Sequence, residues 1–424
     1  MNLHTFIESK MPKIFSYPNV NADFHFAHSH RDFVVSEIPL YDFSGNGEHQ
    51  ILQIRKKNLS TFELIKILST YLSCPAKAIG YAGLKDKNAT TTQYFSIPKI
   101  YFKHKSIESV FEEIATKGEI KLISTTLHNN KIKLGHLQGN RFFIRLKKVT
   151  PLNAKKIESS LKIMEQDGFA NFFGFQRFGI DGENYKLGFA LANLHNNNAK
   201  NASPSANATN RIKIPKSKKM RNFLRSSLQS FLFNEWLMMR LLLGRFSEFN
   251  FGDFCEAIKK SADNVESHIA KSSALDSLQN QAFSNLANLP NKILGQIHQT
   301  LRKQKQPFKL LNGDICCHYP HGRFFTLDSV CAKELKRFDS KEFAPTGALD
   351  GKNLKSARDI AGEIESPFLQ IDCKSNGTRR YAWVWAFDCE CKYKENQAQM
   401  ELHFSLPSGA YATTMLEQIA GKQL

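Results

Sequence analysis

The chain has 424 residues, 42% of them hydrophobic, and this length predicts two or more domains with buried cores. It carries 58 Lys and Arg against 39 Asp and Glu, so its formal net charge of +19 favours an acidic partner, with nucleic acid first and a membrane surface as the competing explanation. No basic amphipathic helix stands out, no stretch approaches the roughly 20 apolar residues of a membrane span, and residues 1–20 lack the apolar segment of a secretory signal. These absences predict a cytoplasmic protein.

The eight cysteines show no C-x-x-C spacing, which argues against a structural zinc site and favours reduced thiols. The sequence also lacks P-loop, dinucleotide and other metal signatures. We therefore expect neither a cofactor nor a metal.

The first 150 residues combine several strands with few helices. Ser60 and Glu63 form a capping box that opens an amphipathic helix, and Pro75 closes it. A turn is expected at 138–140, within a hairpin whose second arm places Phe142 on its apolar face. The expected strands are 32–38, 50–56, 94–97, 131–137 and 141–149. This pattern predicts an α+β fold built on an antiparallel or mixed sheet.

The chain becomes helical after Pro151 and returns to strands near its end. Residues 193–210 are rich in Asn, Ala and Ser, which predicts a loose loop. Gly244 is expected to stop the helix predicted over 221–243. The expected helices are 153–166, 221–243 and most of 250–305, and the expected late strands are 381–388 and 399–406. We therefore predict a catalytic domain formed by 1–168 and 376–424, with an inserted helix-rich α/β domain over 169–375.

One short segment, 80–93, combines a reactive group with cations. Asp86 is a lone carboxylate between Lys85 and Lys87, and nearby positive charge favours its ionised form. An ionised, positioned carboxylate can act as a nucleophile, and lysines beside it can hold phosphates of a polyanion. A solvated turn has the same composition, so on the residues alone both interpretations stay open.

Two further segments carry candidate binding residues. In 134–142, Asn140 could hydrogen-bond a carboxylate and Phe142 could stack on a base, although a plain hairpin with Phe142 in the core explains the same pattern. In 171–179, Arg177 could contact a phosphate or a carboxylate.

Taken in order, these segments resemble the TruD family of tRNA pseudouridine synthases. Residues 83–89 (Gly-Leu-Lys-Asp-Lys-Asn-Ala) are similar to the family's catalytic-aspartate motif, and 139–142 (Gly-Asn-Arg-Phe) to its Gly-Asn-x-Phe motif. Residues 171–179 are similar to Asn-Tyr-Phe-Gly-x-Gln-Arg-Phe-Gly, with Phe in place of Tyr. Residues 406–413 are similar to Leu-Pro-x-Gly-x-Phe-Ala-Thr, with Tyr411 in place of Phe, and the strand at 32–37 is similar to the family's opening strand.

The resemblance implies a mixed-sheet pseudouridine synthase fold with a central cleft and an inserted domain, and isomerisation of uridine 13 of tRNA. Asp86 would be the nucleophile, oriented by Asn140, with attack at ribose C1′ or uracil C6 left open. Lys85 or Lys87 would help to keep Asp86 ionised. The flipped base would stack on Phe33, Phe142 and Tyr411. The candidates for RNA backbone contact are Arg177 and the basic run of Lys213, Lys216, Lys218, Lys219 and Arg221, although a solvated face explains the same run equally well.

Some features leave the resemblance incomplete. The family often has a Lys a few residues before Phe33; residues 25–30 contain histidines but no Lys, so that role does not transfer. Glu37 is expected in solvent, with pairing to a basic residue as the alternative. A monomer without an obligatory protein partner is expected.

A non-catalytic RNA-binding or RNA-folding protein is the alternative function. A metal-dependent nuclease would need several converging carboxylates, and an RNA methyltransferase would need a more complete glycine-rich loop than 45–47 provides.

Overall fold

The computed structural model of the chain describes residues 15–17, 20–103, 106–179, 181–197, 215, 217–263, 277–369 and 375–424. Of the residues considered above, Lys213, Lys216, one of the eight cysteines (Cys373) and most of the loop at 193–210 lie outside these ranges. No helix in the described ranges is long and apolar enough to cross a membrane.

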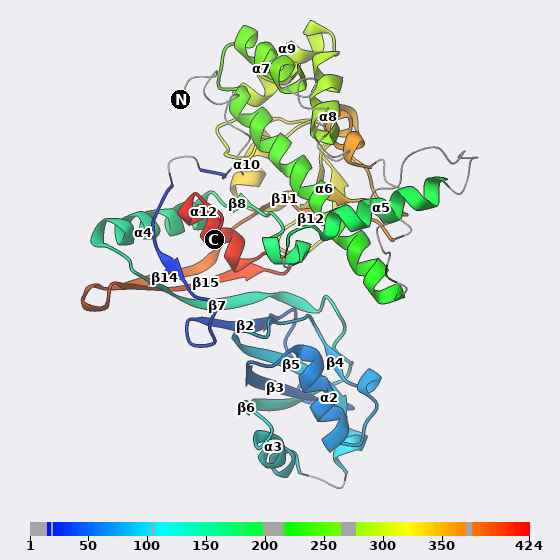
Figure 1. The fold of residues 1–424 in the computed structure, drawn as a ribbon, viewed down its shortest axis with the longest axis vertical. Coiled ribbons are helices and arrows are strands. Elements are labelled where there is room, and N and C mark those ends of the chain that lie inside the picture. The colour runs from blue at the N-terminus through cyan, green and yellow to red at the C-terminus, as the bar shows by residue number, and fades with distance from the viewer. Residues whose placement is uncertain are drawn as a thin grey trace, which may run out of the picture.

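A nine-stranded mixed sheet carries residues from both ends of the chain (Figure 1). Its main order is β14-β15-β7-β2-β5-β3-β6, with β1 beside β7 and β4 beside β5, and the β2–β5 pair is parallel. Because β15 pairs with β7 along nine residues, the end of the chain completes a sheet that the first 150 residues begin. The strands are β1 (His25–Phe26), β2 (Phe33–Pro39), β3 (His49–Lys57), β4 (Gly80–Tyr81), β5 (Thr90–Pro98), β6 (Ile120–His128), β7 (Leu137–Lys147), β14 (Phe387–Lys394) and β15 (Gln399–Pro407).

Two pairs of helices bury separate parts of this sheet. Helices α2 (Thr61–Tyr71) and α3 (Ile107–Ala115) share an apolar core with β3 and β5. Helices α4 (Pro151–Gln166) and α12 (Ala412–Ala420) share another with β7 and β15. The predicted capping box is confirmed, because the Ser60 side chain accepts from the Glu63 N–H and Glu63 accepts from the Ser60 N–H.

The middle of the chain forms a helical body around a four-stranded sheet of order β10-β9-β11-β12 (Figure 1). The long helix α6 runs through its apolar core, where Arg240 forms a buried ion pair with Asp314 at 2.6 Å. The helices are α5 (Asn184–Asn197), α6 (Lys218–Phe246), α7 (Phe251–Asp263), α8 (Ser277–Ala287), α9 (Asn291–Arg302), α10 (Ala332–Asp339) and α11 (Asp359–Glu365). The strands are β9 (Ile315–His318), β10 (Phe324–Thr326), β11 (Phe343–Leu349) and β12 (Thr378–Tyr381), and a separate two-stranded sheet joins β8 (Phe169–Ala170) to β13 (Trp383–Val384).

The turn predicted at 138–140 is wrong, because these residues lie inside β7. Gly139 pairs with Pro407 on one side and with Ile38 on the other. A Cβ at Gly139 would clash with the Leu406 carbonyl oxygen, so this glycine permits close strand approach. The turn lies earlier, at Gly135, where φ is +90°.

Other boundaries also differ from the sequence prediction, and residues 131–136, expected as the first arm of the hairpin, form no strand. Helix α6 continues through Gly244 to Phe246, because packing in the core outweighs the modest cost of a glycine within a helix. Helix α5 extends to Asn197, into the segment expected to be a loop. The strand expected over 381–388 is divided among β12, β13 and β14, which belong to three different sheets.

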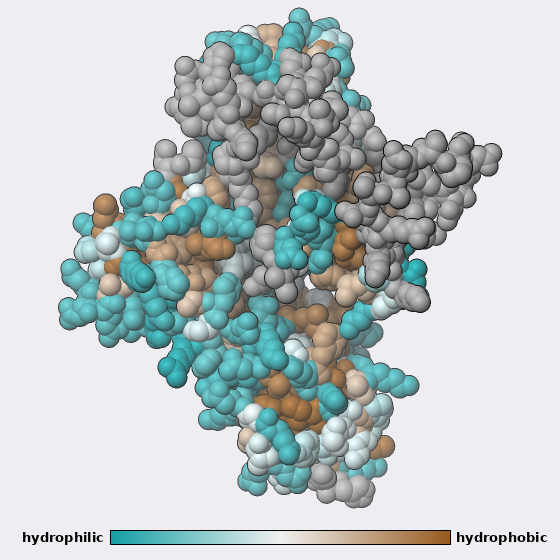
Figure 2. All heavy atoms as spheres, viewed as in Figure 1, coloured by the Kyte–Doolittle hydropathy of each residue, from teal (hydrophilic) through white to brown (hydrophobic). Residues whose placement is uncertain are grey.

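Figure 2 shows apolar side chains between the helical body and the nine-stranded sheet, and further apolar patches lie over the lower part and on the left of the molecule among hydrophilic surface.

Candidate active site

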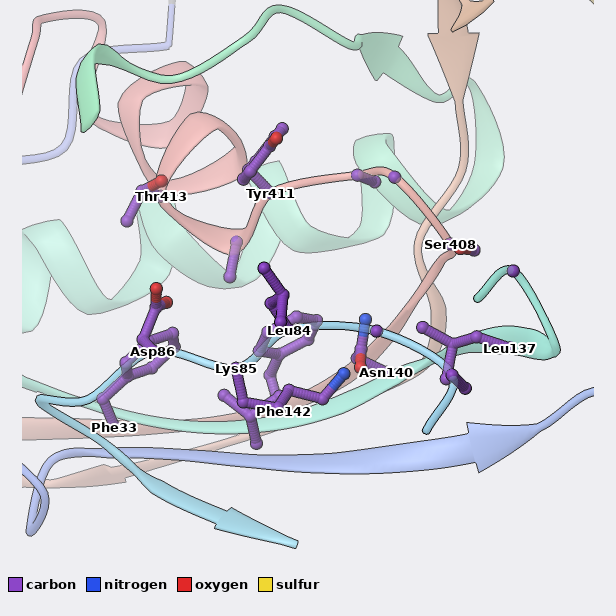
Figure 3. A pocket seen from close by; sticks show the side chains of 17 residues that line it. Phe33, Leu84, Lys85, Asp86, Leu137, Asn140, Phe142, Ser408, Tyr411 and Thr413 are labelled. Carbon is purple, nitrogen blue, oxygen red and sulfur yellow. The ribbon is translucent and has the colours of Figure 1, made fainter. Parts of the chain in front are cut away.

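A pocket of about 320 Å³ lies where the Asp86 loop, β7 and the segment before α12 meet (Figure 3). It collects six of the eight predicted site residues from segments that are far apart in sequence. Figure 3 shows the Asp86 carboxylate pointing across the pocket toward Thr413, with Tyr411 on the same side as Thr413 but farther along the pocket. The lining residues named by prediction are Phe33, Lys85, Asp86, Asn140, Phe142 and Tyr411.

The Asp86 loop is fastened from beneath by a polar network. Gln93 of β5 donates to the Gly83 carbonyl at 2.6 Å and accepts from the Thr61 hydroxyl at 3.1 Å. The Thr61 hydroxyl in turn accepts from the backbone N–H of Lys85 at 3.0 Å. Because Thr61 and Gln93 are both buried, these bonds hold the backbone just before Asp86 in a fixed position.

A buried ion pair stands directly below this loop. The Lys85 ammonium lies 2.8 Å from Glu37 Oε1, with side-chain exposures of 6% and 1%, and the Tyr94 N–H donates to Glu37 Oε2 at 2.9 Å. Burial raises the pKa of Glu37, and the Lys85 charge opposes this shift. The expectation of a solvent-exposed Glu37 is therefore wrong, and the alternative of pairing with a basic residue is confirmed.

Lys56 is a second buried cation near Asp86. Its ammonium donates to the Leu59 carbonyl at 2.5 Å, and the side chain is fully buried. Burial, reinforced by repulsion from Lys85, lowers the pKa of Lys56 to about 8, while the Asp86 carboxylate acts in the opposite direction.

Asp86 itself is exposed in the pocket. Within the described part of the chain, no Lys or Arg nitrogen lies within 4.0 Å of its carboxylate. Lys85 turns to Glu37, and Lys87 lies 3.1 Å from Glu63 at the surface, outside the pocket lining. Neither lysine therefore pairs directly with Asp86 in this structure, and both their help in keeping Asp86 ionised and their contact with substrate stay predictions.

His28 belongs to this electrostatic environment, although sequence analysis gave it no role. Its ring lies 6.1 Å from that of Phe33, which lines the pocket. Burial lowers the pKa of His28, and the Asp86 carboxylate opposes the shift. A lowered pKa favours the neutral imidazole at neutral pH.

Aromatic rings form the floor and one wall of the pocket. Phe33 and Phe142 lie nearly parallel, with centroids 6.2 Å apart, and Phe404 stacks behind Phe142 at 5.4 Å. Phe33 and Phe142 are buried, whereas Tyr411 on the opposite side is 37% exposed. Phe142 is therefore both a core residue, as the plain-hairpin interpretation expected, and a residue that lines the pocket.

Asn140 lies apart from Asp86 along the pocket (Figure 3), and the described residues show no hydrogen bond between them. The expectation that Asn140 orients Asp86 by direct contact is wrong in this structure. Its amide nitrogen points into the pocket, and its buried Oδ1 has no hydrogen-bond partner among the described residues. Contact with substrate remains a prediction.

Two of the predicted RNA-backbone residues, Arg177 and Lys219, can be placed relative to the pocket. Arg177 lines a neighbouring cavity, where its Nε donates to the Ser230 hydroxyl at 3.1 Å. At the start of α6, the Lys219 ammonium lies 5.1 Å from the ring centre of Phe62 on α2, so the basic end of α6 reaches the helix below the Asp86 loop. Sequence analysis missed Arg380, which donates to the Gly409 carbonyl at 2.7 Å and thereby braces the segment before Tyr411.

Comparison with known proteins identifies the family. The model of the family described as tRNA pseudouridine synthase D (TruD) matches residues 21–203 and 291–419. A tRNA pseudouridine synthase D of Helicobacter hepaticus is 42% identical over 414 residues, covering 97% of this chain and 96% of the relative. The chain belongs to the TruD family.

Two further relatives extend the comparison. A tRNA pseudouridine synthase D of Wolinella succinogenes is 39% identical, covering 98% of this chain and 99% of the relative. A solved structure of a putative tRNA pseudouridine synthase D from Methanosarcina mazei superposes with a TM-score of 0.54 at 21% identity, covering 97% of each chain. The structural match confirms the predicted fold: a mixed sheet with a cleft and an inserted helix-rich body.

Proposed function

We propose that this TruD-family chain isomerises a uridine of tRNA, at position 13, to pseudouridine with Asp86 as the nucleophile. The observation that carries the proposal is the difference between Asp86 and its neighbouring carboxylates. Glu37 and Glu63 are paired with Lys85 and Lys87, whereas Asp86 stands exposed in the pocket without a cation within 4.0 Å in the described ranges. Its negative charge is therefore available to a substrate.

The pocket suits a single base turned out of its stack. Flipping a nucleotide costs a few kcal/mol of lost stacking, which aromatic and apolar contacts in the pocket can offset. The uracil would lie between the Phe33–Phe142 floor and Tyr411. The Asn140 amide nitrogen, which points into the same space, can donate a hydrogen bond to a uracil carbonyl.

The reaction rearranges bonds without adding or removing atoms. The bond between uracil N1 and ribose C1′ breaks, and a bond between uracil C5 and C1′ forms. The C5 proton is lost, and N1 gains a proton. Asp86 would attack ribose C1′ or uracil C6, forming a covalent intermediate that resolves when the turned base rejoins the ribose.

The test is mass-spectrometric mapping of pseudouridine in an unmodified tRNA transcript after incubation with wild type and with Asp86→Asn. We expect one new pseudouridine with wild type and none with Asp86→Asn, with RNA affinity changed less than about threefold, because the substitution preserves shape. Asp42→Asn is the matched control: it removes an exposed carboxylate in the loop after β2 and should retain turnover.

Turnover by Asp86→Asn would refute the nucleophile. Salt-sensitive RNA binding without pseudouridine, tested over a full set of tRNA transcripts, would favour the non-catalytic RNA-binding alternative. The insertion limits of 169–375, the monomeric state, and the cytoplasmic location stay predictions.

A further inference from the structure

A second cavity, of about 370 Å³, lies beside the proposed catalytic pocket and shares Ser408 and Gly409 with it. Its other walls come from the helical body and the segment that leads into it. They include Asn171, Phe173, Arg177, Arg379 and Arg380. A strand of nucleic acid that delivers a base to the catalytic pocket would have this cavity next to it.

The charges of this cavity are only partly balanced. Arg379 is neutralised by Glu365, whose Oε1 lies 2.5 Å from its Nη2, and both side chains are 2% exposed. Arg177 and Arg380, by contrast, have no carboxylate within 4.0 Å among the residues the structure describes. Two guanidinium groups therefore leave a net positive charge in one cavity.

Arg380 is a fixed charge. Its guanidinium donates to the carbonyl oxygens of Asn171 at 3.1 Å and Gly409 at 2.7 Å, and it stacks 3.9 Å from the centre of the Phe173 ring. These neutral acceptors hold its plane without cancelling its charge. Arg380 thus braces the 408–411 segment and brings a cation to the boundary between the two cavities.

Arg177 keeps hydrogen-bonding capacity free. Its guanidinium lies 5.7 Å from the centre of the same Phe173 ring, its Nε donates to Ser230, and its Nη2 donates to Ser226. Its Nη1 has no acceptor among the described residues. The two like charges beside one ring repel each other, and a bound anion would relieve that repulsion.

We propose that this second cavity binds the phosphodiester group adjacent to the isomerised uridine, with Arg177 donating to the phosphate oxygens and Arg380 adding fixed positive charge. The proposal rests on the proposed function, because it takes the catalytic pocket to hold a uridine of RNA. A phosphodiester fits because a guanidinium offers paired donors to phosphate oxygens, and because the nucleotide next to a flipped base must pass the shared residues Ser408 and Gly409.

The test uses tRNA stem-loop RNAs in which one linkage near the target uridine is an uncharged methylphosphonate, with a different linkage replaced in each RNA. Dissociation constants are measured for wild type, Arg177→Gln and Arg302→Gln. Arg302 is an exposed arginine at the end of α9 and serves as the matched control. Pseudouridine formation is measured in the same RNAs.

We expect that neutralising one linkage adjacent to the target uridine raises the dissociation constant of wild type about tenfold. The same neutralisation should change the dissociation constant of Arg177→Gln less than about twofold. The other linkages should have equal effects in both proteins, and Arg302→Gln should behave as wild type. Arg177→Lys, which keeps the charge, should recover part of the coupling and guards against a folding defect.

Equal effects of every linkage in wild type and Arg177→Gln, with pseudouridine still formed by wild type, would overturn the phosphate site alone. Absence of pseudouridine in every RNA with wild type would overturn the proposed function, and the site that rests on it.

Discussion

Replacing Lys85 with methionine should destabilise the protein far more than the same replacement at Lys87. Lys85 and Glu37 are almost fully buried and 2.8 Å apart, so their attraction at an effective dielectric constant of 20 is about 6 kcal/mol, most of it offset by desolvation. Lys85→Met removes the attraction and the desolvation cost of the ammonium, but it leaves the desolvation cost of an unpaired, buried carboxylate. We expect a loss of about 3–5 kcal/mol in the free energy of unfolding.

The double variant separates charge from packing. Glu37→Gln in the Lys85→Met background removes the uncompensated charge, and the new side chain can still accept from the Tyr94 N–H. The double variant should therefore be more stable than Lys85→Met alone, with a coupling energy of about 3 kcal/mol. Lys87→Met is the control, since the Lys87–Glu63 pair is about half exposed and solvent screening leaves it a much smaller contribution to stability.

The pH dependence supplies a second check. Burial already raises the pKa of Glu37, and loss of Lys85 raises it further. A carboxyl whose folded pKa lies above its unfolded value contributes stability at low pH, which is lost as pH rises through the folded pKa. Lys85→Met should thus recover part of its stability at pH 5 relative to pH 8.

Urea unfolding at both pH values, together with kcat/KM on tRNA, measures these effects. If the changes in the free energy of unfolding of the two single variants add up to that of the double variant, with a coupling energy below about 1 kcal/mol, the buried-pair argument is refuted. Equal costs for Lys85→Met and Lys87→Met would refute it as well.

Two other predictions follow from the site. Burial lowers the pKa of Lys56 to about 8, so above that pH the unfolded chain binds more protons than the folded chain and stability rises with pH. Between pH 7 and pH 10.5 the free energy of unfolding of wild type, measured in urea, should rise by about 3 kcal/mol relative to that of Lys56→Met. Parallel curves of stability against pH would contradict this. Tyr411→Phe should retain kcat/KM within about threefold because the ring remains, whereas Tyr411→Leu should lose about tenfold or more through lost stacking; equal losses would show that the hydroxyl, not the ring, is what matters.

The sequence was sufficient to bring together much of the pocket. Asp86, Asn140 and Tyr411 lie in three segments that resemble three family motifs, and all three line one cavity. The mixed sheet, the capping box at Ser60 and the helical middle could also be predicted, because each depends on local periodicity or on a short pattern of residues.

The errors concern contacts between distant segments. The glycine at 139 looks like a turn residue until β15 is placed against β7, and the glycine at 244 looks like a helix stop until the core around α6 is known. Glu37 and Lys85 are 48 positions apart in the chain. Arg380 and Asn171 are 209 positions apart, so neither partnership has a local signature.

The pairing of β15 with β7 also sets the order in which the sheet can form while the chain is being synthesised. Roughly 250 residues separate the end of β7 from the start of β15, so at about 5–20 residues per second a ribosome needs about 12–50 seconds to synthesise what lies between them. During that interval β7 lacks the neighbour that covers one of its edges, and an open edge strand invites association with other chains. The segment that carries Tyr411 follows all the other pocket-lining segments in chain order, so a nascent chain has no complete pocket until residues 408–413 have been synthesised.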